Sequence, residues 1–408
     1  MRTLQATCGF LFAAWLLSAC QGVPGPERTS TPAPEQPTLG VLNTPTRQAS
    51  PGSTPSPSPV PSPSPTATAQ LAPLPICKGG SGAGLDELTL TFAAEWDGDL
   101  EIYSIQADGS GLTQLTSNAF DQLDPAWSPD GRQLAYVERI RGLEERLIVA
   151  DADGQDPRVV VPEALGPIVY PTWSPAGDKI AFRNLQDLYI VDVETGEALN
   201  LTERTRPFPV ELSFSADGSM LAFNAQSDVG PTVNNKLFVI NADGTGLREF
   251  TLPGAYGVRR PEWHPTENLI LFEGSGPIEG AEMYLARLDG TIEKLPRQAA
   301  QEAMFPAWSP DGSMIAYEAH TFERLQVVVI DESLDVIVVD LSDEADEVAV
   351  ISSHSWAPDN RHVAYEVNDL DPNTVGVDLY VLDVCDGTSV PVAEAVEAYS
   401  SVSWRPPS

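Results

Sequence analysis

The chain has 408 residues, with 23 Lys and Arg against 58 Asp and Glu, which gives a formal net charge of −35 at pH 7. Nucleic acid is therefore not an expected partner, because phosphate binding needs a basic surface. Residues 76–408 fall within the usual size of one all-β domain and keep 20 basic and 56 acidic residues, a balance that favours solubility.

The N-terminus, residues 1–19, has the pattern of a secretory signal peptide. Arg2 precedes the apolar run Phe10–Leu17, which is too short to span a bilayer as a helix. The run ends in Leu17-Ser-Ala-Cys20, which resembles a bacterial lipobox, so cleavage is expected to leave Cys20 as a lipidated N-terminus. A plain signal peptide cut near Ala19 is the alternative.

Residues 20–75 are expected to form an extended, disordered tether. Residues 22–75 contain 15 Pro and 15 Ser or Thr, and a segment of this composition cannot bury a hydrophobic core. The tether would hold the rest of the chain away from a membrane to which only the lipid on Cys20 attaches it. The predicted location is the bacterial cell envelope, facing the extracellular or periplasmic side.

From residue 76 onward the chain repeats one phrase, made of an aromatic anchor, a four-residue turn and a short apolar strand. Two copies contain Trp-Ser-Pro-Asp-Gly, at 127–131 and 308–312. Pro presets φ and Gly accepts a positive φ, so each copy predicts a β-hairpin turn, with the anchor packed between repeats. Asp-Gly pairs ending at Gly109, Gly154 and Gly244 predict a second hairpin, which makes four strands per repeat. The anchors lie 41 to 49 residues apart, a period typical of propeller blades: Trp127, Trp173, Phe214, Trp263, Trp308, Trp356 and Trp404.

The two ends of the repeat region complement each other. Leu88–Ala94, Leu100–Ser104 and Leu112–Thr116 read as three strands that lack an anchor strand, whereas Val402–Trp404 reads as an anchor strand without the other three. We therefore predict an all-β fold, a seven-bladed β-propeller of four-stranded antiparallel blades, closed by the C-terminal strand joining the N-terminal three. An open array with a truncated last repeat is the alternative.

The repeated phrase resembles the WD40-like propeller repeats of the TolB family, which also occur in the propellers of prolyl-oligopeptidase relatives. The resemblance covers roughly residues 86–408, and residues 76–408 are taken as the propeller domain. TolB itself carries six blades beside a separate α/β domain, whereas the anchors of this chain count to seven. The resemblance implies a propeller and an envelope setting, and it does not name a ligand.

Two cysteines remain in the predicted propeller after Cys8 and Cys20 are set aside. Cys77 precedes the first strand, and Cys385 follows the third strand of the last full blade. A closed ring makes these positions neighbours, so a disulfide that staples the closure is expected. Two unpaired thiols are the alternative.

No catalytic constellation stands out in the sequence. The Gly-x-Ser-x-Gly motif of hydrolases is missing, and the chain ends four residues after Trp404, so we expect no hydrolase domain and no enzyme. His354 and His362 are expected to form a surface pair without a third metal ligand. No metal or cofactor is expected; calcium at the carboxylate-rich segments 151–156, 343–347 or 369–373 is the open alternative.

The candidate binding residues stand three positions before the anchors. The connections between the second and third strands and between blades are long and individual, so their face of the ring is where binding is expected. At that face, the expected mouth of the central channel, stand Asp124, Tyr170, Glu211, Arg260 and Phe305, followed by Ser353 and Ser401. Two aromatics, two carboxylates and an arginine suit a polar ligand with a flat apolar surface.

The sequence thus predicts a surface-tethered, non-enzymatic and monomeric propeller that binds an envelope protein, a peptide or an envelope polymer such as a polysaccharide. Two alternatives stay open. One is a carbohydrate-binding module, and the other is a propeller hydrolase or lyase with its active site at the channel mouth.

Overall fold

The structure of the protein is a computed structural model that describes fifteen segments of the chain. They are residues 83–96, 98–141, 144–162, 166–184, 187–203, 208–226, 235–252, 257–276, 280–296, 302–320, 325–331, 336–340, 350–368, 377–396 and 402–407. The predicted signal peptide, tether, lipidation at Cys20 and the disulfide partner Cys77 lie outside these segments and remain predictions. Within them, no helix has the length and apolar character needed to cross a membrane.

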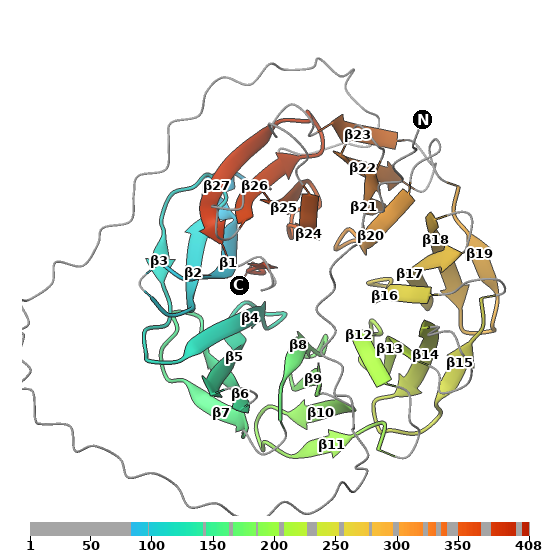
Figure 1. Ribbon diagram of the computed structural model, residues 1–408, viewed down its shortest axis with the longest axis horizontal. Helices are drawn as coiled ribbons and strands as arrows, with labels where there is room; N and C mark the ends of the chain where they lie inside the picture. The colour runs from blue at the N-terminus through green and yellow to red at the C-terminus, as the bar shows by residue number, and fades with distance from the viewer. Residues whose placement is uncertain are drawn as a thin grey trace, which may run out of the picture. The chain divides into compact units, whose positions relative to one another are not determined.

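Seven four-stranded antiparallel sheets stand around a common axis, which confirms the predicted seven-bladed propeller (Figure 1). Six blades follow one another in the chain, and the four strands of each succeed one another from the central axis outward. Blade 1 is β4 (Asp121–Trp127), β5 (Gln133–Arg141), β6 (Glu144–Asp151) and β7 (Arg158–Val161); blade 2 is β8 (Val169–Trp173), β9 (Lys179–Arg183), β10 (Leu188–Asp192) and β11 (Ala198–Asn200). Blade 3 is β12 (Phe208–Phe214), β13 (Met220–Gln226), β14 (Asn235–Asn241) and β15 (Arg248–Phe250); blade 4 is β16 (Gly257–Trp263), β17 (Leu269–Gly276), β18 (Gly280–Arg287) and β19 (Ile292–Lys294). Blade 5 is β20 (Glu302–Trp308), β21 (Met314–His320), β22 (Leu325–Asp331) and β23 (Val336–Asp340); blade 6 is β24 (Val350–Trp356), β25 (His362–Asn368), β26 (Val377–Asp383) and β27 (Ser389–Val396).

The seventh blade is composite, as predicted. Its inner strand is the C-terminal β28 (Ser403–Trp404), followed outward by β1 (Thr89–Ala94), β2 (Glu101–Gln106) and β3 (Thr113–Gln114). The pairing places Trp404 opposite Leu90, and a short 3-10 helix, η2 (Leu85–Glu87), precedes β1. The two ends of the described chain thus close one sheet, and the ring keeps no open edge at this point.

The side chains of the Ser-Pro-Asp-Gly phrase hold its turn. In blade 1 the Ser128 hydroxyl accepts the N–H of Gln133 at 2.9 Å and donates to Asp130 at 2.7 Å. The N–H of Gly131 donates to the Ser128 carbonyl at 2.9 Å, and Gly131 has a φ of 65°, a left-handed conformation that favours glycine. Ser215 with Asp217 and Ser309 with Asp311 repeat the arrangement. The predicted hairpin turn is therefore confirmed.

The anchors pack between neighbouring blades, as predicted. Trp173, for example, lies in one apolar cluster with Val137 and Leu147 of blade 1 and with Phe182 of its own blade. Three indole N–H groups also donate to carbonyls in the inner strand of the preceding blade: Trp173 to Ala126 at 2.9 Å, Trp356 to Ala307 at 3.2 Å and Trp404 to Ser355 at 3.0 Å. The Trp127 indole donates to the Thr91 hydroxyl, in the second strand of the composite blade, at 2.9 Å. Each of these four anchors therefore joins two blades through a hydrogen bond as well as apolar contact.

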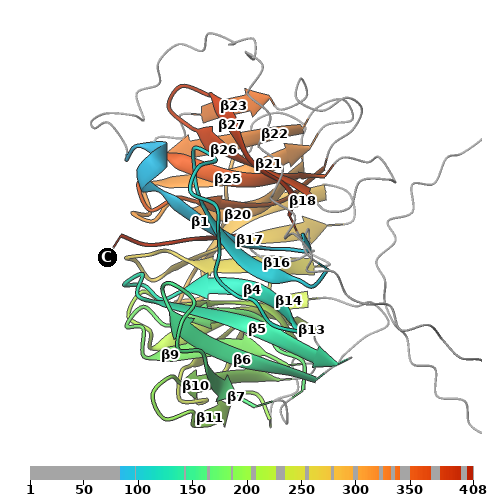
Figure 2. The same cartoon turned by 90° about the vertical axis from the view of Figure 1, so that its left-hand side faces the viewer.

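The ring has two distinct faces. In the side view the short hairpins, η2 and the C-terminus lie on the left (Figure 2). We call this the turn face, and it carries the Ser-Pro-Asp-Gly turns. The opposite face, at which the inner strands begin, is called the loop face; it is the one toward the viewer in Figure 1.

Candidate functional site

The predicted binding residues lie at an irregularity that recurs in the inner strands. In blades 1 to 6 the pairing of the inner strand with the second strand shifts register just before the anchor. Four of the predicted residues sit at this shift with a positive φ, which large side chains seldom adopt: Asp124 at 50°, Tyr170 at 55°, Arg260 at 49° and Phe305 at 56°. We call these four together with Glu211, the corresponding residue of blade 3, the loop-face arc.

Three members of the arc contact one another across blades 3, 4 and 5. The Arg260 guanidinium lies over the Phe305 ring, with its carbon 3.8 Å from the ring centroid. Glu211 accepts the backbone N–H of Arg260 at 2.6 Å, and its other carboxylate oxygen is 3.8 Å from the Arg260 Nε. The side chains of Arg260 and Glu211 are 38% and 25% exposed, so the group is held by neighbours and still open to solvent.

Tyr170 links the arc to the charges of blades 1 to 4. The residue is 45% exposed, and the Arg183 guanidinium lies 5.9 Å from its ring centroid. Partial burial raises the pKa of the Tyr170 hydroxyl, and Glu211 and Asp124 raise it further against the opposing effect of Arg183 and Arg260. All five predicted residues are therefore brought into one neighbourhood. Ser401 and the side chain of Ser353 lie outside the described part of the chain.

A second layer of polar residues supports the arc, and the sequence reasoning missed it. In blades 2 to 5 these residues directly follow the aromatic residue of the second strand, and each reaches the inner strand of the next blade. Arg183 donates to the Pro209 carbonyl at 3.4 Å, and Asn224 donates to the Val258 carbonyl at 3.0 Å. Glu273 accepts the Phe305 N–H, and Glu318 lies 3.4 Å from the Nδ1 of His354. The sequence feature that could have revealed this layer is a polar residue that recurs directly after the aromatic residue of the second strand, within a strand that is otherwise mostly apolar.

Two carboxyl groups of blade 4 have raised pKa values. Burial raises the pKa of Glu262 to about 8, although its carboxylate accepts the backbone N–H of Trp308 at 3.1 Å. Burial also raises the pKa of Glu273, against the nearby Arg259 and the hydrogen bond from Phe305. Ser213 of blade 3 stands at the position that corresponds to Glu262 of blade 4, directly before the anchor. Its hydroxyl accepts the backbone N–H of Trp263 at 3.1 Å, so Ser213 and Glu262 each bridge their own blade to the next one. Within the described segments, neither carboxyl group has a histidine or hydroxyl as a hydrogen-bond partner.

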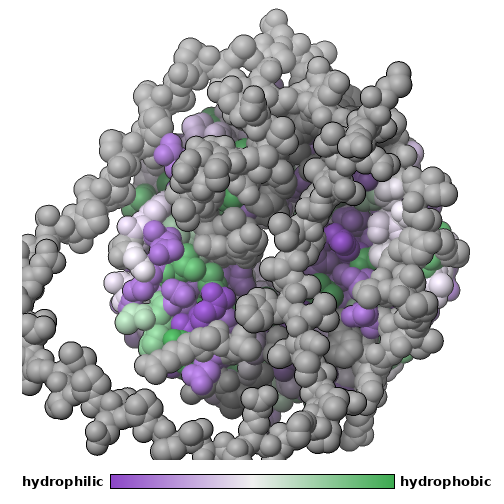
Figure 3. Space-filling view, viewed as in Figure 1, coloured by the Kyte–Doolittle hydropathy of each residue, from purple (hydrophilic) through white to green (hydrophobic). Residues whose placement is uncertain are grey.

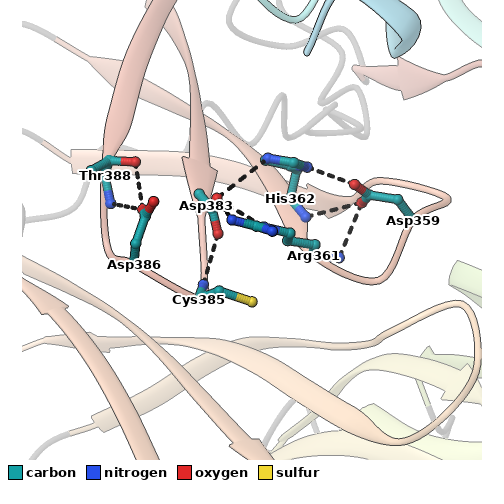
Figure 4. Close-up of polar contacts among 7 residues, drawn as sticks. All are labelled: Asp359, Arg361, His362, Asp383, Cys385, Asp386 and Thr388. Atoms are coloured by element: carbon teal, nitrogen blue, oxygen red, sulfur yellow. Dashed lines mark hydrogen bonds and ion pairs between the residues drawn. The ribbon is translucent and has the colours of Figure 1, made fainter. Parts of the chain in front are cut away.

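A separate cavity of about 290 Å³ lies on the turn face, where blade 6 meets the residues before β1. Its polar lining includes Arg361, His362 and Asp383, and its apolar lining includes Leu85 and Val390. Arg361 donates to one oxygen of Asp383 at 2.9 and 2.5 Å, and His362 lies between Asp359 at 2.7 Å and Asp383 at 3.7 Å (Figure 4). These groups satisfy one another, so the cavity is better explained as part of the ring closure than as a binding site.

The expectation of a surface histidine pair is wrong. His354 pairs with Tyr365 in the sheet and is buried against Glu318, whereas His362 lies at the turn of the same hairpin and is also buried. In this turn Ala357 replaces the usual serine, and the His362 imidazole supplies the hydrogen bond to Asp359 in its place. His264 of blade 4 does the same work differently, because its Nδ1 accepts the N–H groups of Thr266 and Glu267 at 3.2 and 3.0 Å.

The calcium alternative gains no support from the segment that the structure describes. In residues 151–156 the Asp153 carboxylate accepts the N–H of Gln155 at 3.1 Å, which is the contact of an ordinary turn. Among the described residues, no group of three or more His, Cys, Asp or Glu side chains is arranged to hold a metal ion. The carboxylate runs 343–347 and 369–373 lie outside them.

Parts of the chain are similar in sequence to known proteins. A family model described as the dipeptidyl peptidase IV (DPP IV) N-terminal region matches residues 142–208. "Protein TolB homolog" of Chlorobium luteolum is 31% identical over 160 residues, which is 38% of this chain and 35% of the relative. "Tol-Pal system protein TolB" of Desulfosudis oleivorans is 30% identical over 127 residues, which is 30% of this chain and 28% of the relative. "Uncharacterized peptidase YuxL" of Bacillus subtilis is 31% identical over 134 residues, covering 31% of this chain and 19% of the relative. The chain thus matches about a third or less of the length of each.

Solved structures share the fold at low identity. An oligogalacturonate lyase in complex with manganese superposes with a TM-score of 0.57 and 16% identity, over 75% of this chain and 84% of that one. TolB from Acinetobacter baumannii superposes with a TM-score of 0.50 and 17% identity, over 75% of this chain and 79% of that one. At these identities the likeness concerns the fold alone.

Proposed function

We propose that this chain, a TolB-like β-propeller, is a non-enzymatic binding protein of the bacterial envelope that takes a protein or peptide at its loop face. The observation that carries the proposal is the loop-face arc. There the chain keeps large side chains, in Tyr170, Arg260 and Phe305, at backbone positions with φ between 49° and 56°.

These backbone positions are energetically costly for large side chains. A left-handed conformation costs a residue other than Gly roughly 1–2 kcal/mol, and Asn or Asp adopt it more easily. Elsewhere the described chain fills such positions with Gly, or with Asp156 and Asn360 in turns. An aromatic or arginine side chain retained at this cost, and open to solvent as Tyr170 is, points to a role in binding rather than in folding.

The arc is also the part of the inner strands in which the blades differ. Aspartate, tyrosine, glutamate, arginine and phenylalanine follow one another around the axis, one from each of five blades. Figure 3 shows hydrophilic and hydrophobic residues side by side on the part of this face that is described. Such a mixture suits a protein surface or peptide, in which apolar and charged groups alternate.

The relatives support an envelope setting and leave an enzyme as the second candidate. One relative is named as a Tol-Pal system protein and another as a peptidase. The specific observation that favours an enzyme is Glu262, because a carboxyl group with a pKa of about 8 can act as a general acid or base. A binding role is better supported, since Glu262 already bridges two blades and the arc contains no nucleophile beside a base.

The test is capture of a partner from solubilised bacterial envelope by the purified protein. We expect Tyr170→Ala, Arg260→Ala and Phe305→Ala each to reduce capture severalfold while leaving the melting temperature nearly unchanged. Asp108→Ala and Asp243→Ala, in exposed hairpins of the turn face, are the matched controls and should capture as wild type does. Loss in the controls with full capture by the three arc variants would place the binding surface on the other face.

Anchoring is proposed separately, through lipid on Cys20. The Cys20→Ala protein is expected in the soluble fraction, whereas wild type stays with the membranes. Equal membrane retention of both proteins would mean that another segment anchors the chain.

A further inference from the structure

Two guanidinium groups, Arg260 of the loop-face arc and Arg183 of the layer that supports it, have N–H donors without acceptors in the part of the chain that the structure describes. Arg260 is stacked on Phe305 and approaches Glu211 only through Nε at 3.8 Å, which is too long for a hydrogen bond. Glu211 instead bonds to the Arg260 backbone at 2.6 Å. The Arg260 guanidinium therefore stacks on the Phe305 ring and attracts the Glu211 carboxylate. Within the described segments, its N–H groups donate no hydrogen bond.

Arg183 carries the second and independent observation. Its Nε is buried and has no hydrogen-bond partner in the described structure, and its only hydrogen bond there is a long one to the Pro209 carbonyl, at 3.4 Å. Burying a donor without an acceptor costs about 1–3 kcal/mol, so the position calls for an acceptor that the described residues do not supply. Arg183 also lies beneath the exposed ring of Tyr170, whose hydroxyl is close enough to be affected by both guanidinium groups.

The charge of the arc differs from that of the rest of the chain. The basic residues Arg183, Arg259 and Arg260 gather there beside the carboxyl groups of Asp124, Glu211 and Glu273. The arc is therefore a place where basic and acidic residues balance, on a propeller region with 20 basic and 56 acidic residues. Local attraction acts over about 8 Å at physiological salt, whereas the net charge repels any partner that carries many negative charges.

We propose that the arc binds a peptide segment through one carboxylate, held by Arg260 and Arg183, with flat or apolar neighbours of that carboxylate against Tyr170 and Phe305. The planar fork of arginine matches the two oxygens of a carboxylate, and stacking on Phe305 presets its orientation. A polyanionic polymer fits less well, because the surrounding charge opposes it. This inference rests on the proposed binding function and names the group that is recognised.

The experiment uses the purified full chain and immobilised random peptides that lack acidic residues except at one fixed position. In the first set the fixed residue is Asp or Glu, and in a matched set it is Asn or Gln; all C-termini are amidated. A third set has no acidic residue but a free C-terminal carboxylate, which separates a side-chain source from a chain end. We expect carboxylate peptides of the first or third set to bind about tenfold or more tightly than the amide set, which corresponds to ~1.4 kcal/mol.

Variants connect that preference to the arc. Arg260→Gln should abolish the preference, and Arg260→Lys should retain only part of it, because lysine lacks the planar fork. Arg248→Gln is the matched control, since Arg248 also stacks on an aromatic, Phe250 at 5.2 Å, but in the outer strand of blade 3. The control should keep the full preference, and the melting temperatures of all variants should stay close to wild type.

The outcomes are distinguishable. Binding of all peptide sets with equal affinity, or a carboxylate preference that survives in Arg260→Gln, would overturn this inference while leaving the proposed binding function in place. No binding of any peptide set by the wild-type protein would also overturn this inference, whereas the proposed binding function is overturned only by the envelope capture assay.

Discussion

The two ends of the inner strands follow opposite rules. At the turn face every inner strand ends in an aromatic anchor, and the contacts of the turn that follows recur from blade to blade. On the loop-face side of the anchor the same strands contain a register shift, and five different side chains occupy it in five blades. The contacts at the turn face hold the ring together. The residues on the loop-face side can vary, because the pairing between the inner and second strands is already interrupted there.

The exceptions at the turn face show how strict its rule is. Where the serine of the turn is lost, a histidine supplies the missing hydrogen bonds, from within the turn in His264 and from the following strand in His362. The residue type changes while the hydrogen-bonding pattern is kept. Among the five residues of the loop-face arc no comparable substitution preserves a contact in the described structure, since each blade presents different chemistry there.

Removing an anchor at the turn-face end should have the largest effect. Trp404 is buried, packs with Leu90 and Val392, and donates to the Ser355 carbonyl of blade 6. We expect Trp404→Ala to lower the free energy of unfolding by about 3–5 kcal/mol, because a large aromatic is lost from the blade that two distant segments build together. Urea unfolding measures this, with Trp404→Phe as the conservative control at about half the loss. A cost below about 1 kcal/mol for the alanine variant would show that the ring holds without this closure.

The sequence was sufficient to predict the architecture, and the reason is physical. Seven anchors and their turns carry their own hydrogen bonds and packing, so the repeat is read locally and blade number follows by counting. The composite blade followed from Leu88–Ala94 and Val402–Trp404, each of which lacks what the other provides. The five residues of the arc were predictable only by position, as the third residue before each anchor.

The contacts of the arc were not predictable in the same way. The stacking of Arg260 on Phe305 joins blades 4 and 5, and nothing in either repeat specifies how far one blade is rotated from the next. The row formed by Arg183, Asn224 and Glu273 was missed because each residue looks like an isolated polar substitution in an apolar strand. Only the closed ring shows that they reach a neighbouring blade.

Replacing the turn glycine Gly312 with alanine should show how much stability is lost to a steric clash and how much to backbone strain. A Cβ on Gly312 would lie 2.3 Å from the His264 ring, and φ there is 77°. Gly290 has a φ of 97° with nothing within 4 Å, so Gly290→Ala should cost about 1 kcal/mol from strain alone, and Gly312→Ala about 2–3 kcal/mol. Thermal or urea unfolding of both proteins checks the difference. In a His264→Ser background the Gly312→Ala cost should drop to that of Gly290→Ala; an unchanged cost would remove the contact as its cause.

The pH dependence of stability should also distinguish the two kinds of environment. Hydrogen bonds from Ser219 and Ser215 lower the pKa of Asp217 in the folded protein, so its contribution is present above about pH 4 and lost as the pH falls. Glu262 is the opposite case, because its folded pKa of about 8 exceeds the unfolded value of 4.5. Between these values the folded protein binds more protons, so stability falls as the pH rises through this window.

Two variants test these signs. Glu262→Gln should flatten the decline in unfolding free energy between about pH 5 and 8, and Asp217→Asn should flatten the decline below about pH 4. Urea titrations at a series of pH values measure both slopes. A wild-type slope in Glu262→Gln across the neutral range would mean that this carboxyl group is ionised in the folded protein.

The smallest effect on stability is expected at the loop face, and it is the most informative. In Tyr170→Asn, relief of the left-handed backbone gains about 1 kcal/mol, while loss of the ring over Arg183 costs about 0.5–1 kcal/mol. The two nearly cancel, so the free energy of unfolding should stay within about 0.5 kcal/mol of wild type while partner capture falls. Urea unfolding and the envelope capture assay measure the two quantities on the same preparation.

The matched control is Tyr189→Asn in the same blade. Tyr189 stacks on Phe182 at 5.4 Å between centroids, and its hydroxyl accepts a hydrogen bond from Asn200 at 3.0 Å. Its loss should cost about 2 kcal/mol, because an extended backbone gives no strain to relieve, and capture should persist in the fraction that stays folded. If Tyr170→Asn is destabilised as much as this control, the arc is part of the scaffold. The division between a turn face that folds the ring and a loop face that binds would then be wrong.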